Sequence, residues 1–216
     1  MIKRRNTLLD QVYEYLRDQI ISGGIEPGQR LIEEKIAEEL GVSRSPVREA
    51  IRRLEKDGLV SVQPLGGVTV FNPTIQDYQY LFECRFHLEP LAAKYAAQRR
   101  TQQQIEDMEI ILHKTAMGLN DHDRKMIHEL NQSFHQIIVE ASSNPFLIKM
   151  ITELRGVISF YRSSILEIDP LRKDTVVRDH YDIFQAVKEN DTKKAEKSMK
   201  KHLEADYQLY LKTIQT

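Results

Sequence analysis

The sequence predicts a mainly α-helical protein, in which three helices and a small β-hairpin precede an antiparallel bundle of six or seven helices. Two patterns support this prediction. Over most of the chain, apolar residues recur three or four positions apart, as they do along one face of an amphipathic helix. Around residues 60–70, apolar and polar residues instead alternate strictly, which is the pattern of a half-buried strand.

Three helices are expected before residue 58. The first ends before the stop signal Gly23-Gly24, and Gly41 closes the short second helix as a left-handed residue. Ser43 and Ser45 are both candidate N-caps for the third helix. The apolar stripes of the three helices are, in order, Leu8, Val12, Leu16 and Ile20; Ile36, Ala37 and Leu40; and Val47, Ala50, Ile51 and Leu54.

A hairpin follows the third helix. Residues 60–62 and 68–70 alternate between valine and polar residues on either side of a turn at 64–67. This order of elements is the layout of a winged helix-turn-helix, which places its third helix in the major groove of DNA. From Arg44 to Lys56 five basic residues stand against two acidic ones. We therefore predict a DNA-binding domain over residues 1–72, and a structural domain with an ordinary basic helix is the alternative.

Residues 73–216 form the second predicted domain, which is helical throughout. Thr74 and Asp77 make a capping-box signal at its start, and no fixed-period repeat or flexible linker interrupts it. An antiparallel bundle is the expected arrangement. Helices are expected at 75–98, 101–119, 123–141, 146–166, 175–189 and 192–214.

Composition restricts the function classes. The 31 Lys and Arg balance 32 Asp and Glu, so affinity for a polyanion must come from the local distribution of charge. No apolar run approaches the roughly 18 residues that cross a bilayer, and the N-terminal residues lack the apolar stretch of a signal peptide. The single cysteine, Cys84, has no partner for an intramolecular disulfide and is expected in the core. These features favour a cytoplasmic protein with no membrane partner.

Three histidines, His135, His180 and His202, fall on the apolar faces of three different predicted helices. An amphipathic helix normally keeps titratable groups off its buried face. Each one alone is more simply a hydrogen-bonded core histidine, but together they can converge on a divalent metal ion inside a bundle. Asn131 lies four residues before His135 on the same face and offers an amide oxygen as a fourth ligand. Both interpretations stay open at this point.

Arg85 also lies on a buried stripe, with Tyr78 and Leu81. A buried guanidinium needs an anionic partner. Glu89, four residues later, is one candidate. A bound carboxylate, which a guanidinium binds through two parallel hydrogen bonds, is the other.

The segment Leu31–Leu59, with Gly-Val-Ser-Arg-Ser-Pro-Val-Arg-Glu-Ala-Ile at its centre, resembles the DNA-binding domain of GntR-type bacterial transcription regulators. The second half, through Glu83–Glu89, Asn131–His135, His180 and His202, resembles the FadR-type (FCD) effector domain of that family. A count of six helices resembles its VanR-type subgroup. The resemblance implies a homodimer on an inverted-repeat operator in double-stranded DNA. It also implies that a small-molecule effector, often an organic acid, modulates DNA affinity.

The resemblance assigns the DNA contacts to the third helix and the wing tip. Its arginines would read guanine edges, its serines would bond phosphates, and its glycines would let the wing approach the groove closely. Some members place a base-contacting Arg in the second helix where this chain has Glu34, so that contact is not carried over. The residues assigned to DNA are Ser43, Arg44, Ser45, Arg48, Gly66 and Gly67.

The metal-binding branch of the family resembles this chain at His135, His180 and His202, which implies a divalent cofactor such as Zn, Ni or Mn. The first ligand of that branch is usually Asp, where this chain has Asn131. An Asn oxygen coordinates without bringing charge, so the ion keeps its full charge. We therefore expect metal binding to depend on an anionic effector bridged between the ion and Arg85.

Two other function classes remain. A metal-dependent hydrolase with an appended winged helix would use a three-histidine ion to activate water. The sequence lacks an H-E-x-x-H motif, a G-x-S-x-G motif and a phosphate-binding glycine loop, so we predict no enzymatic activity. A ligand-free structural DNA-binding protein would use the three histidines only as core groups.

Overall fold

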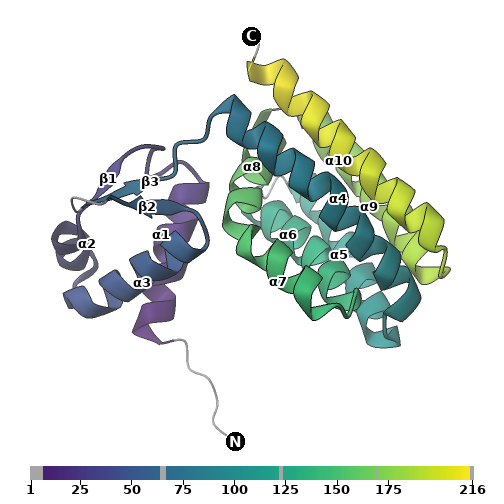
Figure 1. Cartoon of the computed structure of the whole chain (residues 1–216), viewed down its shortest axis with the longest axis horizontal. Helices are drawn as coiled ribbons and strands as arrows, with labels where there is room; N and C mark the ends of the chain where they lie inside the picture. Colours follow the sequence, from purple (N-terminus) through teal and green to yellow (C-terminus); the bar gives the residue numbers. More distant parts are fainter. Residues whose placement is uncertain (1–6, 64–66, 122–123, 169, 215–216) are drawn as a thin grey trace, which may run out of the picture. The chain divides into compact units, whose positions relative to one another are not determined.

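The computed structural model describes residues 7–63, 67–121, 124–168 and 170–214, which divide into two compact units (Figure 1). The first unit comprises Met1–Thr74 and Glu153–Phe160, and the second comprises Ile75–Thr152 and Tyr161–Thr216. Helices predominate, as predicted. In the described ranges, none of the helices combines the length and the apolar character that crossing a membrane requires.

The first unit has the predicted winged helix-turn-helix fold. Its strands are antiparallel in the order β1-β3-β2, with Val60 opposite Val70 and Leu31 opposite Val68. The sequence did not predict β1, because two residues are too few to show alternation. The elements are α1 (Leu8–Ile21), β1 (Arg30–Leu31), α2 (Glu33–Leu40), α3 (Arg44–Lys56), β2 (Val60–Val62) and β3 (Val68–Val70).

Local sequence sets the helix boundaries of this unit. The hydroxyl of Thr7 accepts a hydrogen bond from the backbone N–H of Asp10, and the Asp10 carboxylate accepts one from the N–H of Thr7, which closes a capping box at the start of α1. Gly41 ends α2 with a φ of 63°, so the predicted left-handed closure is confirmed. Ser43, not Ser45, is the N-cap of α3, and Pro46 therefore lies in the first turn, which tolerates proline.

The predicted apolar stripes form the core of the first unit, except that Leu40 is only partly buried against it and Leu8 lies outside it. Leu8 is 49% exposed because it is the first residue of α1 and extends past the end of the core. The buried members from the three helices are Val12, Leu16, Ile20, Ile36, Ala37, Val47, Ala50, Ile51 and Leu54, and they pack with Leu59, Val60, Val68 and Val70 of the sheet region.

Seven helices make up the described chain after residue 74. The single helix predicted over 146–166 is wrong, because the chain breaks at Leu154 into α7 and α8, just before Gly156, a residue that disfavours a helix by about 1 kcal/mol relative to Ala. The count of six helices, and the VanR-type resemblance that depended on it, therefore lose their support. The helices are α4 (Ile75–Arg99), α5 (Gln102–Asp121), α6 (Arg124–Ala141), α7 (Pro145–Glu153), α8 (Arg155–Ile168), α9 (Pro170–Lys188) and α10 (Thr192–Ile214).

Helix α4 is central to the second unit. It packs against α6, α9 and α10, and α9 and α10 lie beside each other along it (Figure 1). Small residues at Ala93, Ala96 and Ala97 allow this close approach and are fully buried. Cys84 is exposed, so its predicted place in the core is wrong. At about 100° per residue, Cys84 falls off the buried stripe that Leu81 and Arg85 share.

Candidate functional site

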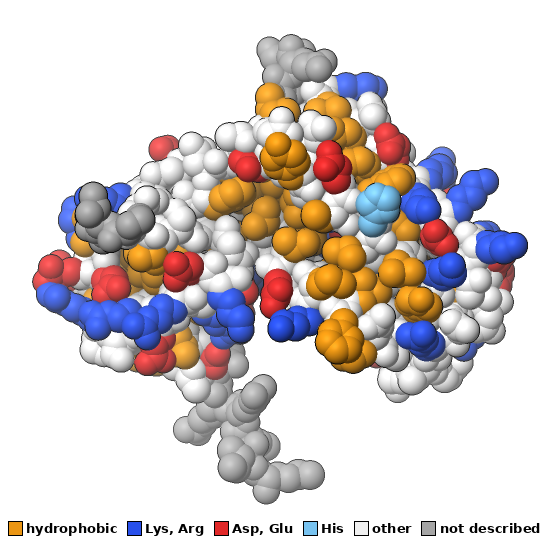
Figure 2. Space-filling view, in the orientation of Figure 1, with side chains coloured by type: hydrophobic (Ala, Val, Ile, Leu, Met, Phe, Trp, Pro, Cys, Tyr) orange, Lys and Arg blue, Asp and Glu red, His pale blue; other side chains and the backbone are white. Residues whose placement is uncertain are grey.

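The N-terminal turns of α3 present a polar surface to solvent. All four of the predicted DNA-contacting residues of this helix are exposed, while Val47 among them is completely buried. Figure 2 shows a row of Lys and Arg side chains on this unit. The exposed residues are Ser43, Arg44, Ser45 and Arg48. At the wing, Gly67 has a φ of 113°, which favours glycine, whereas Gly66 lies outside the described residues.

Two acidic residues at the start of α2 pair with the arginines of α3. Arg48 Nε donates to Glu33 Oε2 at 3.1 Å, and Arg44 donates to the carboxylate of Glu34. All four side chains are at least 30% exposed. In this chain the carboxylate of Glu34 pairs with Arg44.

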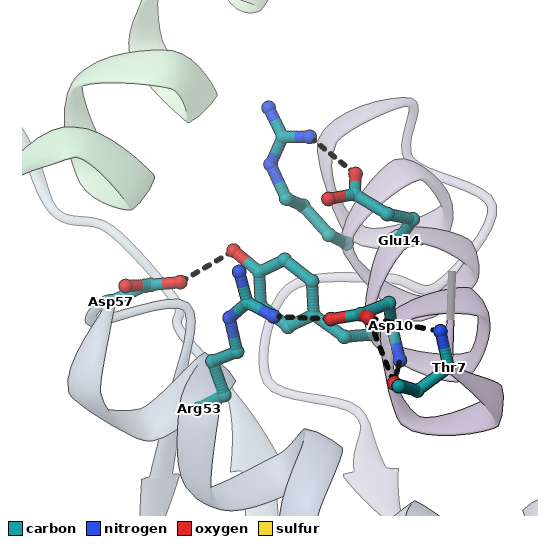
Figure 3. A network of polar contacts seen from close by, with 7 residues as sticks. Thr7, Asp10, Glu14, Arg53 and Asp57 are labelled. Carbon is teal, nitrogen blue, oxygen red and sulfur yellow. Dashed lines mark hydrogen bonds and ion pairs between the residues drawn. The ribbon is translucent and has the colours of Figure 1, made fainter. Parts of the chain in front are cut away.

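Arg53, a third arginine of α3, serves the structure of the first unit. Its Nη1 lies 3.2 Å from Asp10 Oδ1 of α1, and its guanidinium lies 3.9 Å from the centre of the Tyr13 ring. The Tyr13 hydroxyl donates to Asp57 at 2.5 Å (Figure 3). This network joins α1 to α3. Of the five basic residues between Arg44 and Lys56, Arg53 is therefore already paired with groups of its own unit.

The three predicted histidines converge in the second unit. His135 comes from α6, His180 from α9 and His202 from α10, and each is at most 4% exposed. The centres of their rings lie 4.8–5.2 Å apart, and one ligand nitrogen from each lies within 4.8 Å of the other two. The ring of Phe134 stacks on His180 at 4.4 Å, which limits the rotation of that imidazole. This convergence is the arrangement that the metal-binding interpretation of the three apolar faces requires.

The chemistry of this group fits a divalent metal ion. In the part of the chain that the structure describes, His135 Nε2 and Asn131 Oδ1 are buried without a hydrogen-bond partner, although a satisfied core would supply one. Both atoms are lone-pair donors suited to Zn, Ni or Mn. Asn131 is 5% exposed and lies one helical turn before His135, on the same face of α6. The residues therefore offer three imidazoles and one amide oxygen.

Carboxylates lie next to two of the three imidazoles. Glu89 Oε2 lies 3.1 Å from His135 Nδ1, and Asp179 Oδ2 lies 3.7 Å from His202 Nδ1. Asp206, one turn after His202, has its Oδ2 3.6 Å from His202 Nε2. Carboxylates that accept from the second ring nitrogen orient metal-binding histidines and increase their basicity. Sequence reasoning singled out only Glu89, and for a different purpose.

Arg85 meets its internal partner. Its Nε donates to Glu89 Oε1 at 2.6 Å, and Arg162 of α8 donates through Nη2 to Glu89 Oε2 at 2.8 Å. Both arginines are more than 90% buried. Arg162 was not among the residues predicted from the sequence. Its place on a buried helix face could have been inferred from the sequence, because it lies four residues after Ile158, which is buried on the same face.

Burial and charge change the pKa values of this cluster. Burial opposes ionisation of Glu89, but Arg85 and Arg162 hold its pKa well below the usual range. Burial, reinforced by repulsion from Arg162, lowers the pKa of His135 to about 3. Burial also lowers the pKa of Arg162 to about 10, which leaves it charged at neutral pH. At neutral pH the cluster thus holds a neutral imidazole, an ionised carboxylate and two guanidinium cations.

Two family models match the chain. The model of bacterial regulatory proteins, gntR family, matches residues 8–70, and the model of the FCD domain matches residues 80–205, more than half of the chain. The chain belongs to the GntR family. Its second half is an FCD effector domain.

Known proteins similar to this GntR-family chain are regulators. YdhC of Bacillus subtilis, described as an uncharacterized HTH-type transcriptional regulator, is 32% identical over 197 residues, covering 91% of this chain and 88% of YdhC. The HTH-type transcriptional repressor RspR of Escherichia coli is 28% identical over 195 residues, covering 90% of this chain and 85% of RspR. The solved structure of E. coli McbR/YncC matches with a TM-score of 0.81 at 27% identity, over 98% of this chain and 99% of that one. The chain is therefore a transcriptional regulator and not an enzyme.

Proposed function

We propose that this GntR-family regulator binds an inverted-repeat operator as a homodimer, and that an organic-acid effector at a divalent metal ion changes its affinity for DNA. In this proposal residues 1–72 bind DNA, and residues 73–216 bind the effector and dimerise, in the cytoplasm. The observation that carries it is the convergence of three buried imidazoles from three helices of an FCD domain.

The DNA side of the proposal rests on the exposed face of α3. Helix-turn-helix domains contact base edges with the N-terminal residues of this helix. Arg44 and Arg48 are assigned to bases, Ser43 and Ser45 to phosphates, and the Gly66-Gly67 wing tip to the adjacent groove. Among the described residues the Ser43 side chain makes no capping hydrogen bond, so its hydroxyl remains available for a phosphate.

The effector side of the proposal rests on the buried cluster. Asn131, His135, His180 and His202 would hold the ion, which supplies a Lewis-acidic position for a carboxylate. Arg85 would bind the same effector, because Glu89 engages its Nε and leaves Nη2 without a hydrogen-bond partner in the described ranges. Effector binding changes DNA affinity only if its free energy differs between dimer arrangements that do and do not fit the operator.

The first experiment is elemental analysis of untagged protein purified without chelator, beside a His135→Ala/His180→Ala double variant. We expect about one ion per chain in the unmodified protein and none in the variant. His113→Ala is the control, because His113 is exposed on α5. DNA sequences selected from a random pool by the full-length protein should contain an inverted repeat.

A protein that binds DNA but takes up neither metal nor carboxylate would contradict the proposal. That result would instead support the ligand-free structural alternative. Selection of a single half-site by a monomer would contradict the proposed dimer.

A further inference from the structure

Three buried hydrogen-bond donors in the second unit have no acceptor among the described residues. They are Nη2 of Arg85, Nε of Arg162 and the hydroxyl of Tyr78. The three residues are 2%, 7% and 1% exposed, in that order. A buried donor without an acceptor is costly, and most of all when it carries a charge. Three of them together indicate that a bound group completes the site.

Two of these donors, on Arg85 and Arg162, belong to one cluster around Glu89. Each guanidinium uses one nitrogen on this carboxylate, at 2.6 Å for Arg85 and 2.8 Å for Arg162, and keeps another nitrogen unused. Tyr78 lies two helical turns before Arg85 on the buried face of α4, and it interacts electrostatically with both arginines. One oxygen of Glu89 also lies 3.1 Å from His135. A single carboxylate, that of Glu89, therefore separates the arginines from His135.

The charges of the buried region are balanced only before an ion is bound. Arg85 and Arg162 are offset by Glu89 and by Asp206, which interacts with both arginines and is 5% exposed. Asp179, beside His202, faces Lys201 at 4.0 Å, and because the Lys201 side chain is 71% exposed this pair lies at the edge of the buried region.

Bound metal would upset this balance. Three imidazoles and the amide of Asn131 bring no negative charge, so a divalent ion leaves two positive charges uncompensated in a buried site. A ligand that carries two negative charges restores neutrality, and a monocarboxylate leaves one charge unmatched.

Building on the proposed metal site, we propose that Arg85, Arg162 and Tyr78 form a second carboxylate subsite beside the histidines. The effector is then a short dicarboxylate, with one carboxylate at the ion and the other on Arg85 Nη2, Arg162 Nε and the Tyr78 hydroxyl. Guanidinium groups suit this role because they bind a carboxylate with two parallel donors. The ligand is short because Glu89 alone spans the distance between His135 and the arginines.

The test measures ligand binding to full-length, metal-loaded protein by calorimetry. The probes are malonate and succinate, compared with propionate and butyrate, which have the same numbers of carbon atoms. We expect each dicarboxylate to bind at least about tenfold more tightly than its matched monocarboxylate, since hydrogen bonds to charged groups are worth about 1.5–3 kcal/mol and each 1.4 kcal/mol is tenfold. Inorganic phosphate is a further probe, because it carries more than one negative charge on a single group and so tests whether two separate carboxylates are needed.

The key variant is Arg162→Gln, which keeps a polar side chain but removes the charge. It should bind succinate no more tightly than butyrate, and circular dichroism and metal content are measured alongside to check that the variant is folded and metal-loaded. Tyr78→Phe removes one hydroxyl from the same subsite and should reduce succinate affinity by a smaller factor. This second variant tests the subsite even if Arg162→Gln does not fold. Arg178→Gln is the matched control, because Arg178 is exposed on α9.

Three outcomes would overturn the dicarboxylate subsite: equal affinities for succinate and butyrate, a preference for succinate that survives Arg162→Gln, or phosphate binding more tightly than either dicarboxylate. The proposed function fails separately. Monocarboxylates that still bind the metal-loaded protein and change its DNA affinity would uphold the proposed function while the second subsite fails. Absence of metal from the unmodified protein would refute the proposed metal site itself.

Discussion

Oε2 of Glu89 lies 3.1 Å from Nδ1 of His135, which connects a carboxylate of α4 to an imidazole of α6 inside the second unit. A proton on Nδ1 that points toward Glu89 leaves Nε2 as the lone-pair nitrogen, the form in which histidine binds a metal. The same carboxylate accepts hydrogen bonds from Arg85 and Arg162. Glu89 therefore connects the histidine group to the arginine cluster.

The lowered pKa of His135 predicts that metal-free protein loses stability in mild acid. In the unfolded chain this histidine binds a proton as the pH falls below 6.5, whereas in the folded protein it does so only near 3. Between these values the unfolded state holds more protons, so the free energy of unfolding decreases as the pH is lowered. Each additional proton is worth about 1.4 kcal/mol per pH unit.

Urea denaturation of chelator-treated protein at pH 7, 6 and 5 measures this loss. His135→Gln should flatten the dependence on pH, while His113→Gln, a change at an exposed residue, should leave it as it is. The measurements stop at pH 5 because Glu89, whose pKa in the unfolded chain is 4.5, contributes to the pH dependence of stability mainly at lower pH. An identical pH dependence in His135→Gln would show that this imidazole binds its proton at the same pH in the folded and unfolded states, which contradicts the lowered pKa.

Asn131→Asp should strengthen metal binding. The aspartate would keep an oxygen at the same position of α6 and add the negative charge that the four predicted ligands lack. We expect the metal dissociation constant to fall by at least about tenfold, and the dependence of metal binding on added carboxylate to weaken. Competition with a chromophoric chelator measures the first effect. Unchanged affinity would place Asn131 outside the coordination sphere, and Asn144→Asp, a change at the start of α7, controls for charge alone.

Arg48→Ala should weaken binding to the selected operator by about 1–3 kcal/mol and relax the base preference at one position of each half-site. Arg52→Ala, which removes the same charge from a later turn of the exposed face, should weaken all DNA sequences about equally. Fluorescence anisotropy with operator and random DNA measures both. If Arg48→Ala lost affinity equally on random DNA, Arg48 would be a phosphate contact.

Glu33→Gln should increase affinity for the operator more than affinity for random DNA. Glu33 accepts from Arg48 at 3.1 Å, so a base edge must displace a carboxylate that is already in place before Arg48 can contact it. Removing this carboxylate frees the arginine and lowers the local repulsion of DNA. Glu39→Gln removes an equal charge from the same helix, at an exposed position farther along the chain, and should have a smaller effect. Equal effects of the two variants would mean that charge alone matters and the ion pair does not.

Tyr13→Phe should destabilise the first unit by about 0.5–1.5 kcal/mol, because it removes a hydrogen bond to Asp57 and keeps the ring under Arg53. Tyr15→Phe, a change at a half-exposed residue of the same helix, should be close to neutral. Thermal denaturation compares the two variants, and DNA affinity should be unchanged in both. Stability equal to that of the unmodified protein would contradict the structural role of this network.

The winged helix-turn-helix was predictable because its signals are local. Gly41, Ser43 and Pro46 mark a tight turn within six residues, and the apolar stripes on either side have a clear helical period. The break at Leu154 was not predictable, because the apolar pattern continues across it. Strand β1 was missed because its two residues are identified as a strand only by pairing with β3.

By itself the sequence determined the helical fold class, the GntR resemblance and the three histidines that share a buried environment, since each depends on periodicity or on a continuous motif. The tertiary structure alone decided which groups surround them. Arg162 lies 73 residues from Glu89, and Asp10 lies 43 residues from Arg53. Side chains so far apart in the chain become neighbours only when helices pack, so the carboxylate shared by two arginines and a histidine was visible only in the folded protein.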